Sequence, residues 1–132
     1  MTGKCGRAIQ ALSQFIGPSN ETKTILEDWS SVIQFDLMGE DPFYLQISNS
    51  AASFHNGKVE KPDVVLSGRS DAFFDVITGK LDPDEAYVMK KYEVKGSVVD
   101  AMKFRRISEL TEARHKTAFS LLKTVGKIAV RK

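Results

Sequence analysis

The chain has 132 residues, 42% of them hydrophobic, which suits one soluble domain with a single core over residues 1–132. Its net charge of +2 is too small to indicate a nucleic-acid partner. A single cysteine, Cys5, excludes an internal disulfide framework and fits a reducing, cytoplasmic compartment. No apolar run approaches the roughly 18 residues that a membrane-spanning helix needs.

The chain is expected to begin with two helices. The first is predicted over residues 6–16, where four apolar residues recur at helical spacing. They are Cys5, Ile9, Leu12 and Ile16. Gly17 and Pro18 end this helix. Ser19 or Asn20 can cap a second, short helix. The apolar residues assigned to that helix are Ile25, Leu26 and Trp29.

After the second helix the hydrophobic period changes to the two-residue alternation of a β-strand. Five strands are predicted, around residues 33–37, 43–48, 52–55, 64–66 and 92–94. Turn residues follow the first strand at 39–42 and the third at 56–57. The alternation predicts a sheet with one apolar face that helices must cover. That face carries Phe35, Leu37, Leu45 and Ile47.

Helices are also predicted between and after the last two strands. Ser70 is placed as the cap of a helix that ends at a left-handed Gly79. Asp82 and Pro83 supply the cap and first residue of the next helix. Another helix follows the last strand, and its apolar side is expected to carry Val98, Ala101 and Met102. A separate, final helix is predicted to begin near Ser108.

No catalytic or metal-binding constellation is recognisable in the sequence. His55 and His115 have no further ligand-type residues at the spacing of a metal site. The acidic run Asp82-Pro83-Asp84-Glu85 is interpreted as the cap and first turn of a helix and not as a catalytic or metal site. Arg105 and Arg106 are interpreted as part of a solvated basic face, because aromatic residues do not alternate with them as in nucleic-acid modules. We therefore predict no metal, no cofactor and no nucleic-acid partner.

Three short motifs stand in order between residues 62 and 107: Val76-Ile77-Thr78-Gly79-Lys80-Leu81-Asp82-Pro83, then Val94-Lys95-Gly96, then Ala101-Met102-Lys103. In this order they resemble the sterol carrier protein (type 2) domain family, over about residues 29–110. The resemblance implies an α+β fold, in which helices cover one face of a five-stranded, mostly antiparallel sheet and a hydrophobic tunnel lies between. It also implies non-enzymatic binding and transfer or presentation of fatty acids, fatty acyl-CoA or isoprenoid and sterol-like lipids.

The helices hold many large apolar residues, which the pattern alone assigns to a solid core and the resemblance assigns to a tunnel lining. The predicted lipid-binding residues are Phe73, Phe74, Ile77, Leu81, Tyr87, Met89, Val98, Met102, Phe119 and Leu122. Family members often carry glutamine and glycine where this chain has Met89 and Lys90, which removes a polar partner for a lipid head group. Val99 stands in place of a family glycine and is expected to narrow the tunnel.

Two other functions stay open at this point. A small isomerase or cyclase would need a titratable group such as Tyr87, Tyr92 or Asp75 inside an apolar pocket. An accessory domain would use the same apolar helices to bind a protein partner. The chain itself is expected to be a monomer or a weak homodimer. For a lipid carrier, the final helix is expected to make transient contact with anionic membranes through outward-facing lysines. These are Lys116, Lys123 and Lys127.

Overall fold

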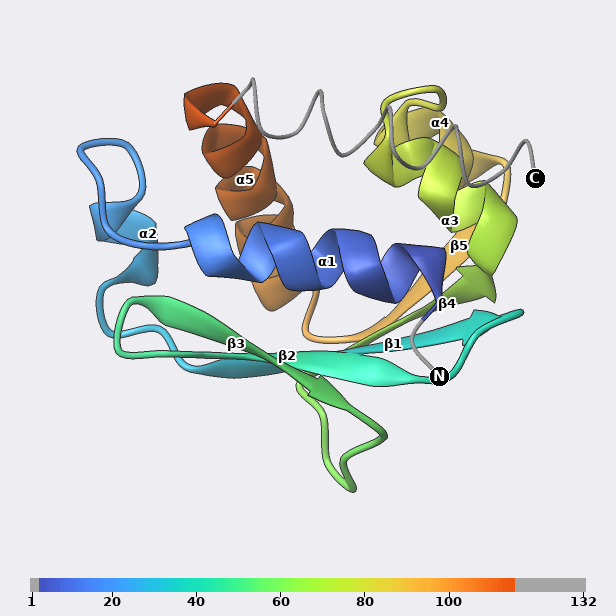
Figure 1. The fold of residues 1–132 in the computed structure, drawn as a ribbon, viewed down its shortest axis with the longest axis horizontal. Helices are drawn as coiled ribbons and strands as arrows, with labels where there is room; N and C mark the ends of the chain where they lie inside the picture. Colours follow the sequence, from blue (N-terminus) through green and yellow to red (C-terminus); the bar gives the residue numbers. More distant parts are fainter. Residues whose placement is uncertain (1–2, 116–132) are drawn as a thin grey trace.

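A computed structural model describes residues 3–115 of the chain (Figure 1). The helices and strands follow in the order α1 Lys4–Phe15, α2 Lys23–Leu26, β1 Ser31–Met38, β2 Phe43–Ser48, β3 Ala51–Asn56, β4 Val64–Arg69, α3 Ser70–Ile77, α4 Pro83–Val88, β5 Tyr92–Gly96 and α5 Val98–Arg114. All five predicted strands are present. Within these residues no helix is both long enough and apolar enough to cross a bilayer.

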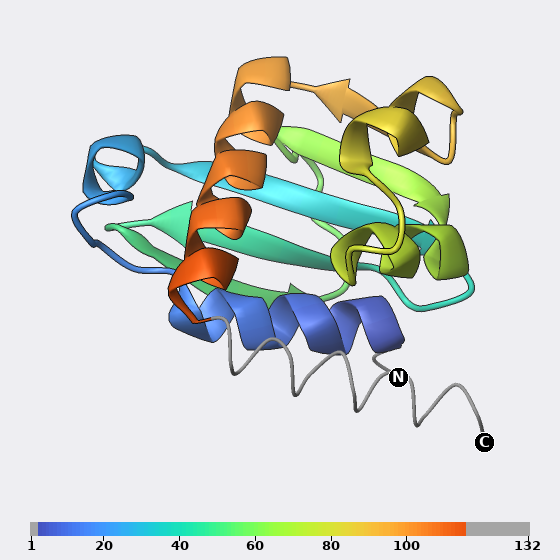
Figure 2. The ribbon, with the colours of Figure 1, turned by 90° about the horizontal axis from the view of Figure 1, so that it is seen from above.

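The five strands form one mixed sheet in the order β3-β2-β1-β4-β5. The β1–β4 pair is parallel and the other three pairs are antiparallel. In Figure 2, α1, α3, α4 and α5 lie over the same face of this sheet, with α5 crossing the strands. The expected α+β architecture, with a mostly antiparallel sheet covered on one face, is thus confirmed.

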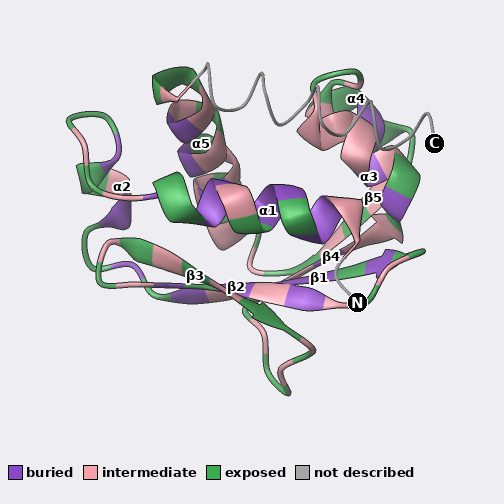
Figure 3. Ribbon diagram, in the orientation of Figure 1, coloured by how far each residue is buried: buried purple, intermediate pink, exposed green. Residues whose placement is uncertain are grey.

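The core lies between this helical layer and the sheet. Phe35, Leu37, Leu45 and Ile47 are at most 3% exposed, which confirms that helices cover the face that carries them. Phe35 is the centre of an aromatic cluster. Its ring stacks on Phe43 at 4.7 Å between centroids, and two helical rings meet it edge-on, each at 5.9 Å. These rings are Phe73 and Phe104. Figure 3 shows the same concentration of buried residues along β1 and on α1 and α5.

The prediction of a separate helix starting near Ser108 is wrong. Helix α5 runs without a break from Val98 to Arg114. Its cap is Ser97, whose Oγ accepts a hydrogen bond from the Asp100 N–H at 3.1 Å. The Ser108 hydroxyl instead donates to the Phe104 carbonyl at 2.8 Å, which satisfies it inside the helix. The predicted residues Phe119 and Leu122 and the three lysines lie outside the described residues.

Other predicted helix ends are confirmed at some positions and wrong at others. The Asp82 carboxylate accepts hydrogen bonds from two backbone N–H groups of α4, each at 3.1 Å, as predicted for a cap. Gly79 adopts the predicted left-handed conformation, with φ of +82°. Ser70, however, is the first residue of α3 and does not cap it. Helix α2 ends at Leu26, so Trp29 lies beyond it; neither Ser19 nor Asn20 is its N-cap, which is Thr22.

Glu40, in the turn between β1 and β2, joins the starts of two helices to the sheet. Its carboxylate accepts hydrogen bonds from the N–H groups of Cys5 at 3.2 Å and Gly6 at 2.8 Å, in the first turn of α1. The hydroxyl of Ser70, at the start of α3, donates to the same carboxylate. A negative charge at a helix N-terminus is stabilising, because the free N–H groups of the first turn point towards it.

The Cys5 side chain is fully buried beside Glu40 and belongs to the core. Its thiol donates to the Ser70 carbonyl at 3.2 Å. Burial, followed by the charge of Glu40, raises the pKa of Cys5 to about 12. The thiol therefore stays protonated at neutral pH and packs as a small apolar group, as its place on the apolar side of the first helix predicted.

We predict that Glu40→Ala lowers the free energy of unfolding by about 2 kcal/mol, because partly buried N–H groups of α1 lose a charged acceptor. Urea denaturation followed by circular dichroism measures this loss. Glu60→Ala is the matched control, since Glu60 is exposed and surface substitutions usually change stability by less than about 0.5 kcal/mol. Equal losses in the two variants would contradict the role given to Glu40.

Candidate ligand-binding pocket

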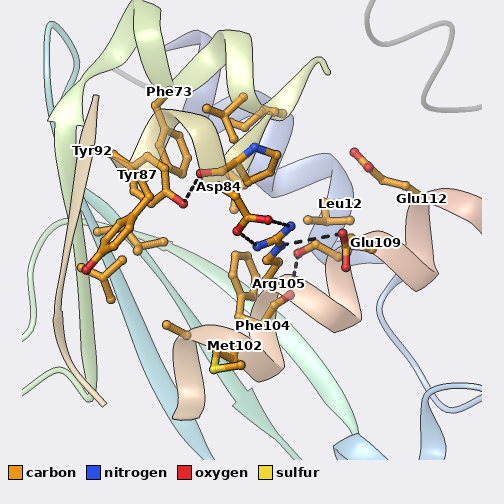
Figure 4. Close-up of a pocket in the computed structure, with 18 of the residues that line it drawn as sticks. Leu12, Phe73, Asp84, Tyr87, Tyr92, Met102, Phe104, Arg105, Glu109 and Glu112 are labelled. Atoms are coloured by element: carbon orange, nitrogen blue, oxygen red, sulfur yellow. Dashed lines mark hydrogen bonds and ion pairs between the residues drawn. The ribbon is translucent and has the colours of Figure 1, made fainter. Parts of the chain in front are cut away.

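A pocket of about 340 Å³ lies between α5 on one side and α3 and α4 on the other (Figure 4). The sheet residues Leu66, Tyr92 and Val94 form its floor. This volume is at the lower end of the range of about 300–1,000 Å³ that is usual for small-molecule sites. The remaining apolar and aromatic lining residues are Ile9, Leu12, Phe73, Val76, Ile77, Pro83, Tyr87, Val98, Ala101, Met102 and Phe104.

The wall formed by α5 changes its chemistry along the helix. Lining residues recur at the three- and four-residue spacing of one helical face, which runs from Val98 to Glu112. In the N-terminal half of that face they are apolar: Val98, Ala101 and Met102. In the C-terminal half they are polar: Arg105, Ser108, Glu109 and Glu112. In Figure 2 the N-terminal half of α5 lies beside β5 and its C-terminal half reaches towards α1. The pocket is therefore amphipathic, with its apolar end along the first half of the helix and its polar end along the second.

An ion pair crosses from α4 to α5 at the polar end (Figure 4). The Arg105 guanidinium donates to both carboxylate oxygens of Asp84, at 2.5 and 3.3 Å. Its Nε also lies 3.7 Å from the Glu109 carboxylate. The hydrogen bonds from Arg105 lower the pKa of Asp84, so this carboxyl is ionised at neutral pH. Both partners are substantially exposed, at 41% and 73%, so the pair contributes little to stability.

Two tyrosines line the pocket where its floor meets α4: Tyr92 in β5 and Tyr87 in α4. The Tyr92 hydroxyl donates to the Pro83 carbonyl at 3.0 Å. Burial raises the pKa of Tyr92, which keeps this hydroxyl neutral. Its ring contacts Phe73 edge-on and lies beside Tyr87, both at 5.8 Å between centroids. The third titratable residue named for an enzyme, Asp75, does not line this pocket.

The structure brings together five of the predicted lining residues: Phe73, Ile77, Tyr87, Val98 and Met102. Phe74, Leu81 and Met89 do not line the pocket. Phe74 follows Phe73 in α3 and so points about 100° away from it; the Lys4 ammonium lies 4.9 Å from its ring. Met89 lies just past the end of α4 and is 59% exposed.

Val99 does not narrow the pocket, contrary to expectation. It is 64% exposed and is not among the lining residues, because the helical face that lines the pocket passes through Val98, Ala101 and Met102. Conversely, sequence reasoning missed Asp84, Arg105 and Glu109, which were assigned to a helix cap or to the solvated surface or were not singled out. For Arg105 and Glu109, the polar residues that continue the apolar row of α5 at helical spacing were a usable signal; Asp84, on α4, had none.

The histidines lie away from the pocket. His55 stacks on Tyr44 at 4.9 Å between ring centroids, on strands β3 and β2. The ring of His115 lies 4.6 Å from that of Phe15. Within residues 3–115, no group of three or more histidine, cysteine, aspartate or glutamate residues is arranged to hold a metal ion.

Comparison with known families identifies the fold that surrounds this pocket. Residues 9–109 match the model of the SCP-2 sterol transfer family. The chain belongs to this family. The match agrees with the family predicted from the motifs between residues 62 and 107. The solved structure of sterol carrier protein domain 2 of Helicoverpa armigera superposes with a TM-score of 0.67 and 20% identity, over 86% of this chain and 95% of that one.

Relatives in sequence are longer proteins. Hydroxysteroid dehydrogenase-like protein 2 of Xenopus tropicalis is 32% identical over 116 residues, which cover 79% of this chain and 28% of that protein. The protein of the same name in Danio rerio is 34% identical over 86 residues, or 63% of this chain and 21% of that protein. The chain thus matches only between 21% and 28% of the length of these relatives.

Proposed function

We propose that the pocket binds the hydrocarbon part of a lipid and that the chain transfers or presents lipids without catalysing a reaction. The observation that carries this proposal is the amphipathic pocket over an SCP-2 family sheet. Each methylene that leaves water for such a lining contributes about 0.8 kcal/mol, before the costs of association. Fatty acids, fatty acyl-CoA and isoprenoid or sterol-like lipids all supply the required apolar surface.

The rim of the pocket supports this proposal. Tyr87, Val98 and Met102 line the pocket and yet are 54%, 62% and 65% exposed. Val88 and Val99, next to them in sequence, are also exposed. Large apolar side chains gathered at an opening indicate a binding surface more strongly than scattered ones do. A lipid chain in the pocket would cover part of this surface.

The pKa shifts in the pocket support binding over catalysis. A general acid or base works best with a pKa near the operating pH. The pKa of Asp84 moves down and that of Tyr92 moves up, so both move away from neutrality. The relatives' printed name includes a dehydrogenase-like description. In a longer protein of that kind, the role we propose for this domain is to present a lipid to a neighbouring domain.

We predict that Ala101→Phe weakens binding of a pyrene-labelled long-chain lipid by about tenfold. Ala101 lines the pocket next to Met102, so the added ring takes up space that the ligand would fill. Loss of the burial of about two ligand methylenes corresponds to a change of this size. Fluorescence titration measures the dissociation constant. Because Ala101 is partly buried, thermal unfolding of the variant is also measured, to show that the variant is folded.

Ala113→Phe is the matched control for this substitution. Ala113 lies on the same helix but is exposed and outside the pocket, so the same ring there should leave the dissociation constant unchanged. Equal affinity in wild type and Ala101→Phe would mean that the lipid binds elsewhere. Wild-type protein that shows no saturable binding, and carries no lipid by native mass spectrometry, would contradict the proposed function itself.

We also propose a transient contact with anionic membranes through Lys116, Lys123 and Lys127, which lie outside the described residues. A lysine near an anionic bilayer adds about 1 kcal/mol of attraction, and salt screens it. Changing all three to glutamate should slow lipid transfer to anionic vesicles and leave equilibrium lipid binding nearly unchanged. Identical, salt-insensitive transfer rates in the two proteins would remove this contact from the mechanism.

A second use of the exposed rim is contact with another protein, including a second copy of the chain. The rim residues Tyr87, Val98 and Met102 favour it because exposed apolar groups also mark protein interfaces. Light scattering at high concentration distinguishes a monomer from a homodimer. A homodimer that dissociates when lipid is added would indicate that the partner and the lipid compete for the same rim.

A further inference from the structure

Among the described lining residues, those at the polar end of the pocket include more carboxylates than cations. The charged ones are Asp84, Arg105, Glu109 and Glu112. Among the described lining residues Arg105 is the one cation, and it already faces two carboxylates, those of Asp84 and Glu109. An entering head group therefore meets a guanidinium whose charge is already balanced.

The other basic side chains of α5 do not correct this excess. Lys103 lies over the Trp29 ring, with its Nζ 5.5 Å from the ring centroid. Arg114 pairs with Glu21 at 3.8 Å. Arg106 is exposed, and none of these three cations lines the pocket. A lipid carboxylate at the polar end would thus lie near two like charges, those of Asp84 and Glu109, and the described lining residues offer it no second cation.

We infer that this pocket selects lipids with an uncharged, hydroxyl-bearing head group over fatty-acid anions, and that Asp84 and Glu109 determine the selection. The inference rests on the proposed lipid-binding function and specifies its ligand class. A hydroxyl group both donates and accepts hydrogen bonds. It can donate to a carboxylate oxygen and accept from the guanidinium, whereas an ionised carboxylate only accepts.

The change from apolar to polar lining residues along α5 also determines the orientation of such a lipid in the pocket. The hydrocarbon chain packs on the apolar half, beside Val98, Ala101 and Met102, and the hydroxyl lies near Arg105. One uncompensated charge at about 4 Å in a solvent-accessible site changes affinity by roughly five- to tenfold. Salt reduces this change, because the groups involved are exposed enough to be screened.

The test compares two probes that differ only in the head group: a pyrene-labelled long-chain alcohol and the fatty acid of the same chain length. For the wild-type protein at neutral pH and low salt, the alcohol should bind roughly five- to tenfold more tightly than the acid. High salt should reduce the ratio of the two dissociation constants. This salt dependence is measured on wild-type protein and so does not depend on how any variant folds.

The double variant Asp84→Asn, Glu109→Gln should bring the two dissociation constants close together by strengthening binding of the acid. Its matched control is Asp36→Asn, Glu60→Gln, which removes the same net charge from outside the pocket. Asp36 pairs with Lys58, and both control positions are exposed. The control should keep the wild-type ratio. Thermal unfolding should be similar in all three proteins, because the Asp84–Arg105 pair is exposed.

Two results would overturn the inference and leave the proposed function standing. One is equal affinity of wild type for the two probes. The other is tighter binding of the acid than of the alcohol, lost in Arg105→Gln, which would mean that Arg105 attracts the lipid carboxylate more strongly than Asp84 and Glu109 repel it. Absence of saturable binding of either probe would overturn the proposed function and this inference together.

Discussion

The pocket depends on how α5 is fixed across the apolar face of the sheet. The Asp100 carboxylate accepts hydrogen bonds from the Trp29 indole N–H at 3.2 Å and the Ser31 hydroxyl at 2.9 Å, which ties the first turn of α5 to the start of β1. Further along, Phe104 and Ile107 are buried in the core. These contacts use one side of the helix, so an adjacent side is left to form the wall of the pocket. The pocket is therefore present because α5 is anchored to the sheet through Asp100, Phe104 and Ile107 and not through the residues that face α4.

The sheet could be predicted because its signal is local, whereas some helix ends could not. Alternation such as that of Phe35 and Leu37 depends only on neighbours in sequence and on one buried face. Ser108 has the residue type of a cap, but it lies within a helix that Phe104 and Ile107 anchor in the core. Lys90 adopts φ of +60°, a left-handed conformation that usually favours glycine, and its residue type gives no local signal of that turn.

The apolar part of the pocket was more predictable than its polar part. Phe73 and Met102 belong to apolar rows of their helices, and any fold that covers the sheet turns such rows inward. Asp84 and Arg105 are 21 residues apart and belong to different helices, so each looks like an ordinary surface charge on its own. Their pairing depends on the spacing between α4 and α5, which arises from tertiary packing and leaves no periodic signal in the sequence.

The exposed rim and the Asp84–Arg105 ion pair both lie where α4 and α5 face each other across the pocket. A helix packed fully against α4 would bury Tyr87 and Met102 and gain the stabilisation of a closed core. Instead α5 and α4 are joined here by the exposed Asp84–Arg105 pair, which contributes little to stability. The apolar surface beneath is left for another molecule to cover. A bound lipid would then complete the core, and protein and ligand would stabilise each other through the same contacts.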